Sequence, residues 1–535
     1  MRGVRLSIAL MLWGCSHALQ AQNNAYFVGF GDKKGCGYEL TQPYRYLSAR
    51  ALERRQRQQI DIDSFDLPVS AAYLERLSQR GCTVLFPLRW LNGAVVRADS
   101  LTASELSALP FVRQVQRVQR AQRPASIAGA MLAHGPHYDA PSYYAQAYEQ
   151  IRQLGGDRLH ERGFTGRGSV IAVLDAGFQH TDVHPMFDSL RLSGRLLGTR
   201  DFIDPSSNIY AEDAHGAMVL STMAGLQPGI MVGASPHAQF WLIRTEDAAQ
   251  EHLLEEFCWI AGAELADSVG ADIITTSLGY NTFDDASQNH PYSALDGRTT
   301  PITRGANMAA QKGMLVVVSA GNEGAKPWRH ITAPADSPMA LTVGAANVSG
   351  TVVGFSSRGP TADGRIKPDI CAMGEWVAVA SGAQGVQHGS GTSFAAPIAA
   401  GLAACLWQAL PNLKPSELIE LIRSSASSST APDNDQGYGL PNFARALGYP
   451  DDGAQPINVY PNPTREALSM SFPWEHSAQA EVLLCSLMGG KVLERSLPVS
   501  MGQLRLVLPP RLQQGVYLLK VRVGERSFVS KIVKL

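Results

Sequence analysis

Four polar residues stand at the ends of short apolar runs, and their types suit acyl-transfer chemistry. Asp175 closes the run SVIAVLD, His215 opens HGAMV, and Asn322 lies in the turn SAGNEG. Ser393 lies in GTSFAAPIAAG, before an apolar, alanine-rich stretch that reads as a helix. Taken singly, each has a simpler explanation: a turn aspartate, a helix-end histidine, a turn asparagine and a helix-capping serine.

Together, the four residues supply the parts of a site built on a serine nucleophile. A serine hydroxyl is a weak nucleophile and needs a base, and histidine titrates near neutral pH. A buried aspartate fixes the imidazole tautomer and stabilises the imidazolium. A helix start offers free backbone N–H groups, and an asparagine amide offers another donor for an oxyanion. The predicted orienting acid, base, nucleophile and oxyanion donor are Asp175, His215, Ser393 and Asn322.

A parallel sheet is predicted to gather these residues. Nearly continuous apolar runs recur within residues 143–449: SVIAVLD, QFWLIRT, ADIITTSLG, MLVVVSAGN, MALTVGA and WVAVAS. Helical stretches such as HLLEEFCWIAGAELADSVG and ITRGANMAAQKG separate several of them. This alternation is typical of an α/β fold whose parallel sheet has helices on both faces. Sites in such folds lie at the carboxyl ends of the strands.

The motifs in this region resemble those of the subtilase (subtilisin-like serine protease) family. The chain order Asp, His, Ser is that of subtilisin, and VIAVLDAGF, HGAMV, SAGNEG and GTSFAAPIAAG are similar to its four site motifs. GASPHAQ, ITAPAD, GFSSRGP and RIKPDICAMG resemble further landmarks. The resemblance implies a serine endopeptidase that cleaves protein or peptide substrates through an acyl-enzyme and requires no cofactor. Structural calcium is frequent in the family, but no carboxylate loop identifies a site here, so none is assigned.

The resemblance also implies substrate contacts. An edge strand in SLGY would pair with the substrate backbone through Ser277, Leu278 and Gly279. The pocket for the side chain before the scissile bond would be lined by Ser319, Ala320 and Gly321. Because these residues are small, we expect a roomy pocket with a broad, apolar preference. Two positions depart from the family pattern: Ala217 follows the His-Gly pair, and Arg358 lies either at the groove or on the surface.

Other functions fit parts of the same pattern. In FQHTDVHPMFD, the clustered side chains suggest a metal site formed by His180, Asp182, His184 and Asp188. However, the motif HExxH is absent, and the His-Pro pair matches the subtilase pattern. No metal is therefore assigned. A sedolisin-like peptidase would need an acidic base and an oxyanion aspartate, and GTSFA does not complete the esterase motif G-x-S-x-G. A catalytically inactive surface-binding protein on a subtilase scaffold is the alternative, although no triad residue is lost.

The N-terminal region divides into three segments. Residues 1–21 have a positive start, a short apolar run and a small-residue exit, which predicts a secretory (Sec) signal peptide, with a lipoprotein signal at Cys15 as the alternative. Residues 22–121 mix strand-like and helix-like stretches and predict a small α+β unit. This unit resembles a subtilase propeptide, which would assist folding and inhibit the enzyme; a permanent N-terminal domain is the alternative. Residues 122–142 form a linker predicted to be exposed and cleavable.

The C-terminal residues 451–535 predict a small β-sandwich that ends in the hairpin VYLLKVRVGERSFVSKIVKL. VYPNP, GVYLLKV and the terminal SKIVKL resemble the C-terminal sorting domain of type IX secretion cargo. The resemblance implies the type IX secretion machinery as a partner, passage through the outer membrane, and a secreted or cell-surface location. A carbohydrate-binding or spacer domain is the alternative. The formal net charge of −1 gives no electrostatic footprint for nucleic acid.

Overall fold

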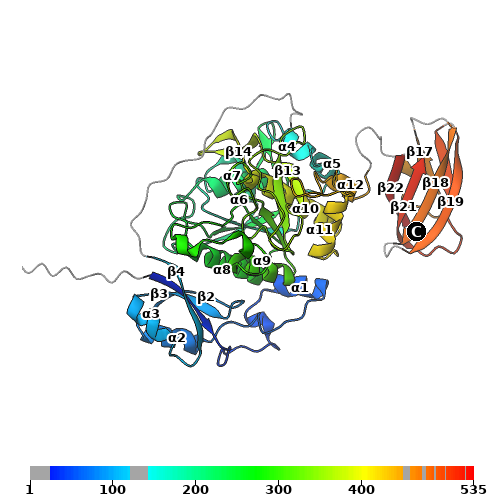
Figure 1. The fold of residues 1–535 in the computed structure, drawn as a ribbon. Helices are drawn as coiled ribbons and strands as arrows, with labels where there is room; N and C mark the ends of the chain where they lie inside the picture. The colour runs from blue at the N-terminus through cyan, green and yellow to red at the C-terminus, as the bar shows by residue number, and fades with distance from the viewer. Residues whose placement is uncertain are drawn as a thin grey trace, which may run out of the picture.

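Three units follow one another along the chain (Figure 1). The computed structural model describes residues 24–120, 143–449, 458–472, 477–486, 490–500, 502–523 and 526–535. The predicted signal peptide and linker lie outside the described residues.

The central unit is the predicted α/β fold, with a parallel sheet of seven strands in the order β13-β12-β11-β10-β5-β9-β6. These strands are β5 (Val170–Asp175), β6 (Leu196–Asp201), β9 (Gln239–Arg244), β10 (Ile273–Thr276), β11 (Leu315–Ser319), β12 (Leu341–Ala346) and β13 (Ile370–Met373). The run WVAVAS, in contrast, forms β14 (Val377–Ser381), which pairs antiparallel with β15 (Gly385–Gly389). It therefore belongs to a hairpin outside the sheet, and RIKPDICAMG supplies the edge strand β13 instead.

Helices cover both faces of this sheet, and β5 shows why its central strands are largely apolar. Ile171 and Val173 join a core cluster with α7 (His215–Ala224) and α10 (Thr392–Ala409). Val170 and Leu174 join the opposite cluster with α8 (Leu254–Val269) and α9 (Pro301–Gln311). Successive side chains of β5 thus enter different cores, so both faces of this strand favour apolar residues. Smaller elements complete the unit: α4 (Tyr148–Arg152), α5 (Gly156–Glu161), α6 (Asp188–Leu192), β7 (Leu226–Gln227), β8 (Met231–Val232), α11 (Pro415–Ser424) and α12 (Phe443–Ala446).

Helix α10 is almost entirely buried. Its 18 residues are long and apolar enough to cross a membrane, yet 89% of them are buried inside the protein. It packs against α7 and against the strands at the centre of the sheet. A helix that is apolar all round is a core helix when it is enclosed in this way, so the position of Ser393 at its start is rigidly determined.

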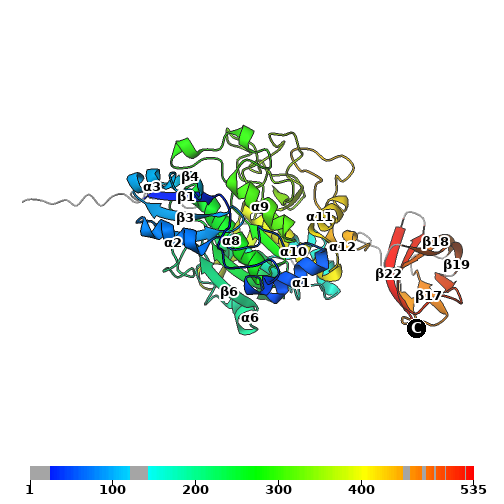
Figure 2. The ribbon, with the colours of Figure 1, turned by 90° about the horizontal axis from the view of Figure 1, so that it is seen from below.

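The N-terminal unit has the predicted α+β fold. Its antiparallel sheet has the order β2-β3-β1-β4. The elements are β1 (Asn24–Phe30), α1 (Ala49–Gln58), α2 (Ala71–Gln79), β2 (Thr83–Leu88), β3 (Gly93–Ala98), α3 (Ser100–Leu106) and β4 (Val112–Gln119). One face of the sheet packs on α2 and α3, whereas Phe27 on the other face stacks on Phe257 of α8 at 5.0 Å. Figures 1 and 2 show the unit against the side of the α/β unit that carries α8 and α9.

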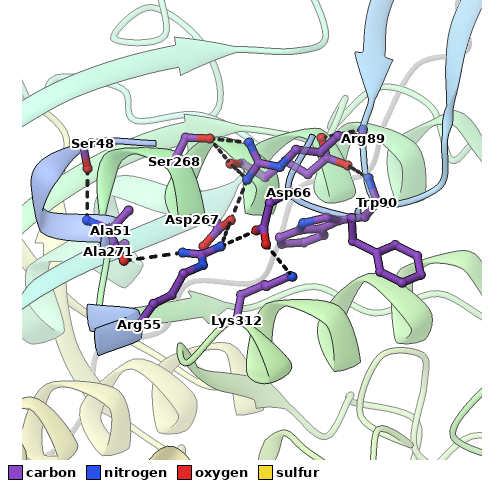
Figure 3. A network of polar contacts seen from close by, with 12 residues as sticks. Ser48, Ala51, Arg55, Asp66, Arg89, Trp90, Asp267, Ser268, Ala271 and Lys312 are labelled. Carbon is purple, nitrogen blue, oxygen red and sulfur yellow. Dashed lines mark hydrogen bonds and ion pairs between the residues drawn. The ribbon is translucent and has the colours of Figure 1, made fainter. Parts of the chain in front are cut away.

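A buried ionic cluster joins these two units (Figure 3). At its centre, the Asp267 carboxylate near the end of α8 forms ion pairs with three guanidinium groups, those of Arg54, Arg55 and Arg89. Its Oδ2 atom lies 2.9 Å from Arg55 Nη2 and 2.6 Å from Arg89 Nη2. The side chains of Asp267 and Arg54 are 0% and 1% exposed. Burial alone would raise the pKa of Asp267, but the three guanidinium groups lower it below the usual aspartate range.

Lys312, which follows α9, forms ion pairs of the opposite polarity across the same interface, with the positive charge on the α/β unit. Its Nζ lies 2.8 Å from Asp63 Oδ1 and 3.0 Å from Asp66 Oδ2, both in the N-terminal unit. Asp66 also accepts from Arg55 at 2.7 Å, which links the two halves of the cluster. Asp267 and Lys312 of the α/β unit thus take their ion-pair partners from the N-terminal unit.

The C-terminal unit is all β, as predicted, but its strands form one sheet and not the two packed sheets of the predicted sandwich. Its antiparallel strands have the order β16-β17-β20-β19-β18-β21-β22. They are β16 (Asn458–Tyr460), β17 (Ala467–Ser471), β18 (Ser477–Ser486), β19 (Lys491–Ser500), β20 (Gln503–Val507), β21 (Gly515–Val523) and β22 (Arg526–Lys534), the last two being the predicted hairpin. The strands form one curled sheet whose ends meet where Thr464 N donates to the Val533 carbonyl at 2.8 Å, so the unit is barrel-like. Leu468, Leu484, Leu519 and Ile532 fill its interior.

Candidate active site

Asp175 and His215 form a hydrogen-bonded pair at the carboxyl end of the sheet. Asp175 is the last residue of β5, and His215 is the first of α7. The His215 Nδ1 atom lies 2.8 Å from Asp175 Oδ1, and the aspartate side chain is 1% exposed. The other ring nitrogen, Nε2, is left for a proton from another group.

Gly216 permits this pair to form. A Cβ at this position would overlap the Gly177 carbonyl oxygen and would lie 2.9 Å from Asp175 Cβ. The first turn of α7 can therefore pack closely against Asp175 only because residue 216 has no side chain. Ala217, where the sequence departs from the family pattern, is buried beside this turn.

Ser393 lies in the first turn of α10, beside α7. Its neighbour Phe394 faces the imidazole of His215, with the ring centroids 6.1 Å apart. The Ser393 Oγ atom donates to the Ser277 carbonyl oxygen at 3.3 Å, and Ser277 Oγ donates back to the Ser393 carbonyl at 2.7 Å. The hydroxyl thus points toward the predicted substrate segment. A rotation about χ1 redirects it, and nucleophile–base hydrogen bonds commonly tighten only when substrate is bound.

Asn322 lies beside the start of α10, as an oxyanion donor requires. Its Oδ1 atom accepts from the backbone N and the Oγ1 of Thr392 at 2.9 and 3.0 Å, which fixes the orientation of the amide. A Cβ placed on Gly391 would meet Asn322 Nδ2 at 3.6 Å and Ser393 N at 3.7 Å. Both donors therefore border the same space beside the serine.

The two predicted substrate segments lie next to each other at the same edge. Ser277, Leu278 and Gly279 follow β10, and Tyr280 then forms an antiparallel bridge with Ala333. Ser319 ends β11, and its Oγ donates to the Leu278 carbonyl at 3.4 Å; Ala320 and Gly321 follow. A third segment, which the sequence analysis did not include in the pocket, places Thr332 between Gly279 and Gly321.

Glu246 is a site residue that the sequence analysis missed. It follows β9, whose last residue pairs with Asp175, and its Oε1 atom accepts from the Tyr280 hydroxyl at 3.4 Å. Burial and the nearby Asp175 charge raise the pKa of Glu246 well above the usual glutamate range. The available signal was its place at the end of the apolar run QFWLIRT, where other strands carry the predicted chemistry.

The surrounding carboxylates also set the protonation of the base. Burial disfavours the imidazolium, but the charges of Asp175, Glu246 and Asp213 outweigh this effect and raise the pKa of His215 to about 9. The arrangement can therefore take a proton from a hydroxyl, stabilise the resulting cation and hold an anionic oxygen, which are the needs of acyl transfer.

Local contacts account for two of the four residues behind the alternative metal hypothesis. His184 Nε2 lies 3.0 Å from the Gly385 carbonyl, and its Nδ1 accepts from Met186 N at 3.1 Å. Asp188 pairs with Arg191. No group of three or more potential ligands with metal-binding geometry occurs in the described parts of the chain. Arg358, the other departure from the family pattern, pairs with the exposed Asp435 at 3.5 Å.

Comparisons with known proteins agree with this geometry. Residues 166–439, about half of the chain, match the Subtilase family. Residues 25–129 match the peptidase S8 propeptide domain of Bacteroidota, and residues 458–535 match the secretion system C-terminal sorting domain. Subtilisin E of Bacillus subtilis is 26% identical over 399 residues, which cover 72% of this chain and 90% of that protein.

Two further relatives agree with this assignment. Subtilisin J of Geobacillus stearothermophilus is 27% identical over 67% of this chain and 81% of its own length. Serine protease AprX of Bacillus subtilis is 30% identical over 53% of this chain and 67% of its own length. The chain belongs to the subtilase family and is a serine-type endopeptidase with a propeptide domain and a C-terminal secretion sorting domain.

Proposed function

We propose that the protein is a secreted endopeptidase that hydrolyses peptide bonds through an acyl-enzyme on Ser393. The observation that supports this most directly is the Asp175–His215 pair at 2.8 Å beside the start of the helix that carries the serine. Ser393 Oγ attacks the scissile carbonyl carbon while His215 Nε2 takes its proton. The Asn322 amide and the Ser393 N–H hold the oxyanion. His215 then protonates the leaving amine, and water releases the acyl group by the same steps.

Labelling with a fluorophosphonate probe tests this function. The mature protein is expected to react at Ser393, and the Ser393→Ala variant is expected not to react. An inactive binding protein on the same scaffold would show no labelling that depends on Ser393. That result would contradict the endopeptidase function and favour the inactive binding protein.

Asn322→Ala is expected to lower kcat by about 10²–10³-fold, because one of the two oxyanion donors is lost. The measurement is steady-state hydrolysis of a peptide anilide. Asn347→Ala is the matched control, because this asparagine also follows a strand and its Oδ1 accepts from Ser349 N at 3.1 Å. If both variants lost activity equally, Asn322 would have only a structural role in its turn, and its role as an oxyanion donor would be excluded.

Peptidase activity is expected to rise with pH into the alkaline range. Only neutral imidazole accepts the serine proton, and the pKa of His215 is raised to about 9. Glu246 favours the imidazolium where it is ionised, although its own pKa is raised. Glu246→Gln abolishes this charge at every pH, so the acid limb of the kcat/KM profile should move to lower pH. Glu149→Gln, at a surface ion pair with Arg152, is the control. An unmoved limb in Glu246→Gln would exclude this electrostatic role.

Export is proposed to use both ends of the precursor. Residues 1–21 direct Sec export, the segment 22–121 inhibits the enzyme until it is removed, and the C-terminal unit is read by the type IX secretion machinery. Deletion of the residues after Asp451 should leave the enzyme in the periplasm, as cell fractionation would show. Normal secretion of the truncated chain would contradict the sorting role. A secreted chain that begins at Gln22 would show that the N-terminal unit is permanent.

A further inference from the structure

Thr332 occupies the space between the two segments that are proposed to hold substrate. A Cβ on Gly279 would overlap Thr332 Oγ1 and would lie 3.0 Å from Thr332 Cβ. A Cβ on Gly321, on the opposite segment, would meet the same Oγ1 atom at 2.9 Å. One threonine side chain therefore reaches both glycines, which belong to the segments after β10 and β11.

The backbone holds this threonine firmly in place. Thr332 N donates to the Ala320 carbonyl at 3.3 Å, and its own carbonyl accepts from Ala335 N at 2.8 Å. The next residue, Ala333, exchanges two hydrogen bonds with Tyr280, at 2.9 and 3.0 Å. Because threonine is branched at Cβ, its side chain has few alternative rotamers to move into. The pocket wall therefore cannot widen by a simple side-chain rotation.

The hydroxyl of Thr332 is buried without a partner. The residue is 3% exposed, and its Oγ1 atom has no hydrogen-bond partner among the described residues. A buried hydroxyl without a partner costs free energy, which a ligand that bonds to it would recover. The neighbouring side chains Ser319 and Ser357 also present hydroxyl groups; Ser357 Oγ lies 2.9 Å from a Cβ placed on Gly321 and accepts from Glu323 N. The end of the pocket is thus small and polar but uncharged at these three residues.

We propose that Thr332 closes the deep end of the pocket and selects a small, uncharged residue before the scissile bond. This inference rests on the proposed endopeptidase function and specifies its substrate class. Alanine, serine and glycine fit the remaining space, and a serine hydroxyl can bond to Thr332 Oγ1. Phenylalanine and leucine would have to displace a side chain that is fixed by its backbone. The small residues Ser319, Ala320 and Gly321 line the walls, but they do not set the depth.

The test compares four peptide p-nitroanilides that differ only in the last residue, which is alanine, serine, leucine or phenylalanine. The mature wild-type enzyme is expected to show a kcat/KM for alanine at least about 10-fold above that for phenylalanine. Thr332→Gly should raise the phenylalanine value at least about 10-fold while the alanine value stays within about 3-fold. A wild-type enzyme that cleaves phenylalanine as well as alanine would overturn the inference, as would an unchanged ratio in Thr332→Gly.

Two further variants separate size from polarity. Thr332→Val keeps the shape and removes the hydroxyl, so it should keep the preference for alanine over phenylalanine and lose any advantage of serine over alanine. Thr332→Ser keeps the hydroxyl and removes one methyl group, so its phenylalanine rate should lie between those of wild type and Thr332→Gly. If Thr332→Gly does not fold, Thr332→Ser decides the matter: a phenylalanine-to-alanine ratio equal to that of the wild type would overturn the role of size.

Titration of the nucleophile keeps this inference distinct from the proposed function. Each preparation is titrated with the fluorophosphonate probe, and rates are expressed per labelled Ser393. A wild-type protein without labelling that depends on Ser393 would refute the endopeptidase itself. A labelled enzyme whose substrate ratios do not respond to Thr332 would refute only the role of this residue.

Discussion

Asp175→Asn is expected to lower kcat by about 10⁴-fold while the fold remains intact. The asparagine fits the same space, but its amide stabilises the wrong imidazole tautomer and cannot stabilise the imidazolium that forms during attack. The loss should appear in both kcat and kcat/KM, because the interaction strengthens in the transition state. Single-turnover hydrolysis of an activated ester and of a peptide anilide would measure it.

Asp213→Asn is the matched control for this variant. Asp213 Oδ1 accepts from the backbone N of His215 at 2.7 Å, so this carboxylate touches the same residue but not its ring. We expect less than about a 10-fold loss, since neither the tautomer nor the direct ion pair changes. Equal losses in the two variants would mean that Asp175 acts only through general electrostatics.

Asp267→Asn is expected to lower the free energy of unfolding of the precursor by about 3–5 kcal/mol. The change leaves the buried guanidinium groups of Arg54, Arg55 and Arg89 without their shared carboxylate. A buried charge that loses its partner is costly because water does not replace it. The measurement is guanidinium-induced unfolding of the precursor in a Ser393→Ala background, which prevents self-cleavage.

Asp285→Asn gives the comparison at the rim of the same interface. Asp285 pairs with Arg117 at 3.1 Å and with Arg120 at 3.4 Å, and these arginine side chains are 35% and 54% exposed. Ion pairs of this kind contribute up to about 1 kcal/mol. A cost at Asp267 no larger than that at Asp285 would show that water reaches the cluster and that the buried pairs are not what holds the units together.

Much of the architecture could be predicted because it follows from local patterns. The apolar runs that end at Asp175 and Ser319 form strands of one parallel sheet, on either side of β10, since burial on both faces leaves a clear signature. WVAVAS carries the same signature but forms a hairpin, because an apolar run does not say which neighbour it pairs with. The roles proposed for the four site residues remain predictions that the variants above test.

The features that escaped prediction depend on contacts between distant segments. Thr332 lies between Gly279 and Gly321 because its neighbour Ala333 forms a bridge with Tyr280, and the composition of the two predicted substrate segments does not reveal this contact. Glu246 came close to Asp175 through the pairing of β9 with β5. The partners of Asp267 lie roughly 180–210 residues earlier in the chain. Propensity and periodicity carry no information about such pairings.

Gly216 has a consequence for how much sequence variation the chain tolerates. Any side chain there would press on Asp175 and on the Gly177 carbonyl, and α7 would move away from β5. In a library of all single substitutions, position 216 should therefore be as intolerant as Ser393, although no proton or electron pair passes through it. Such a scan would group Gly216 with the residues that take part in the reaction. Its contribution is instead steric, because it has no side chain to separate α7 from β5.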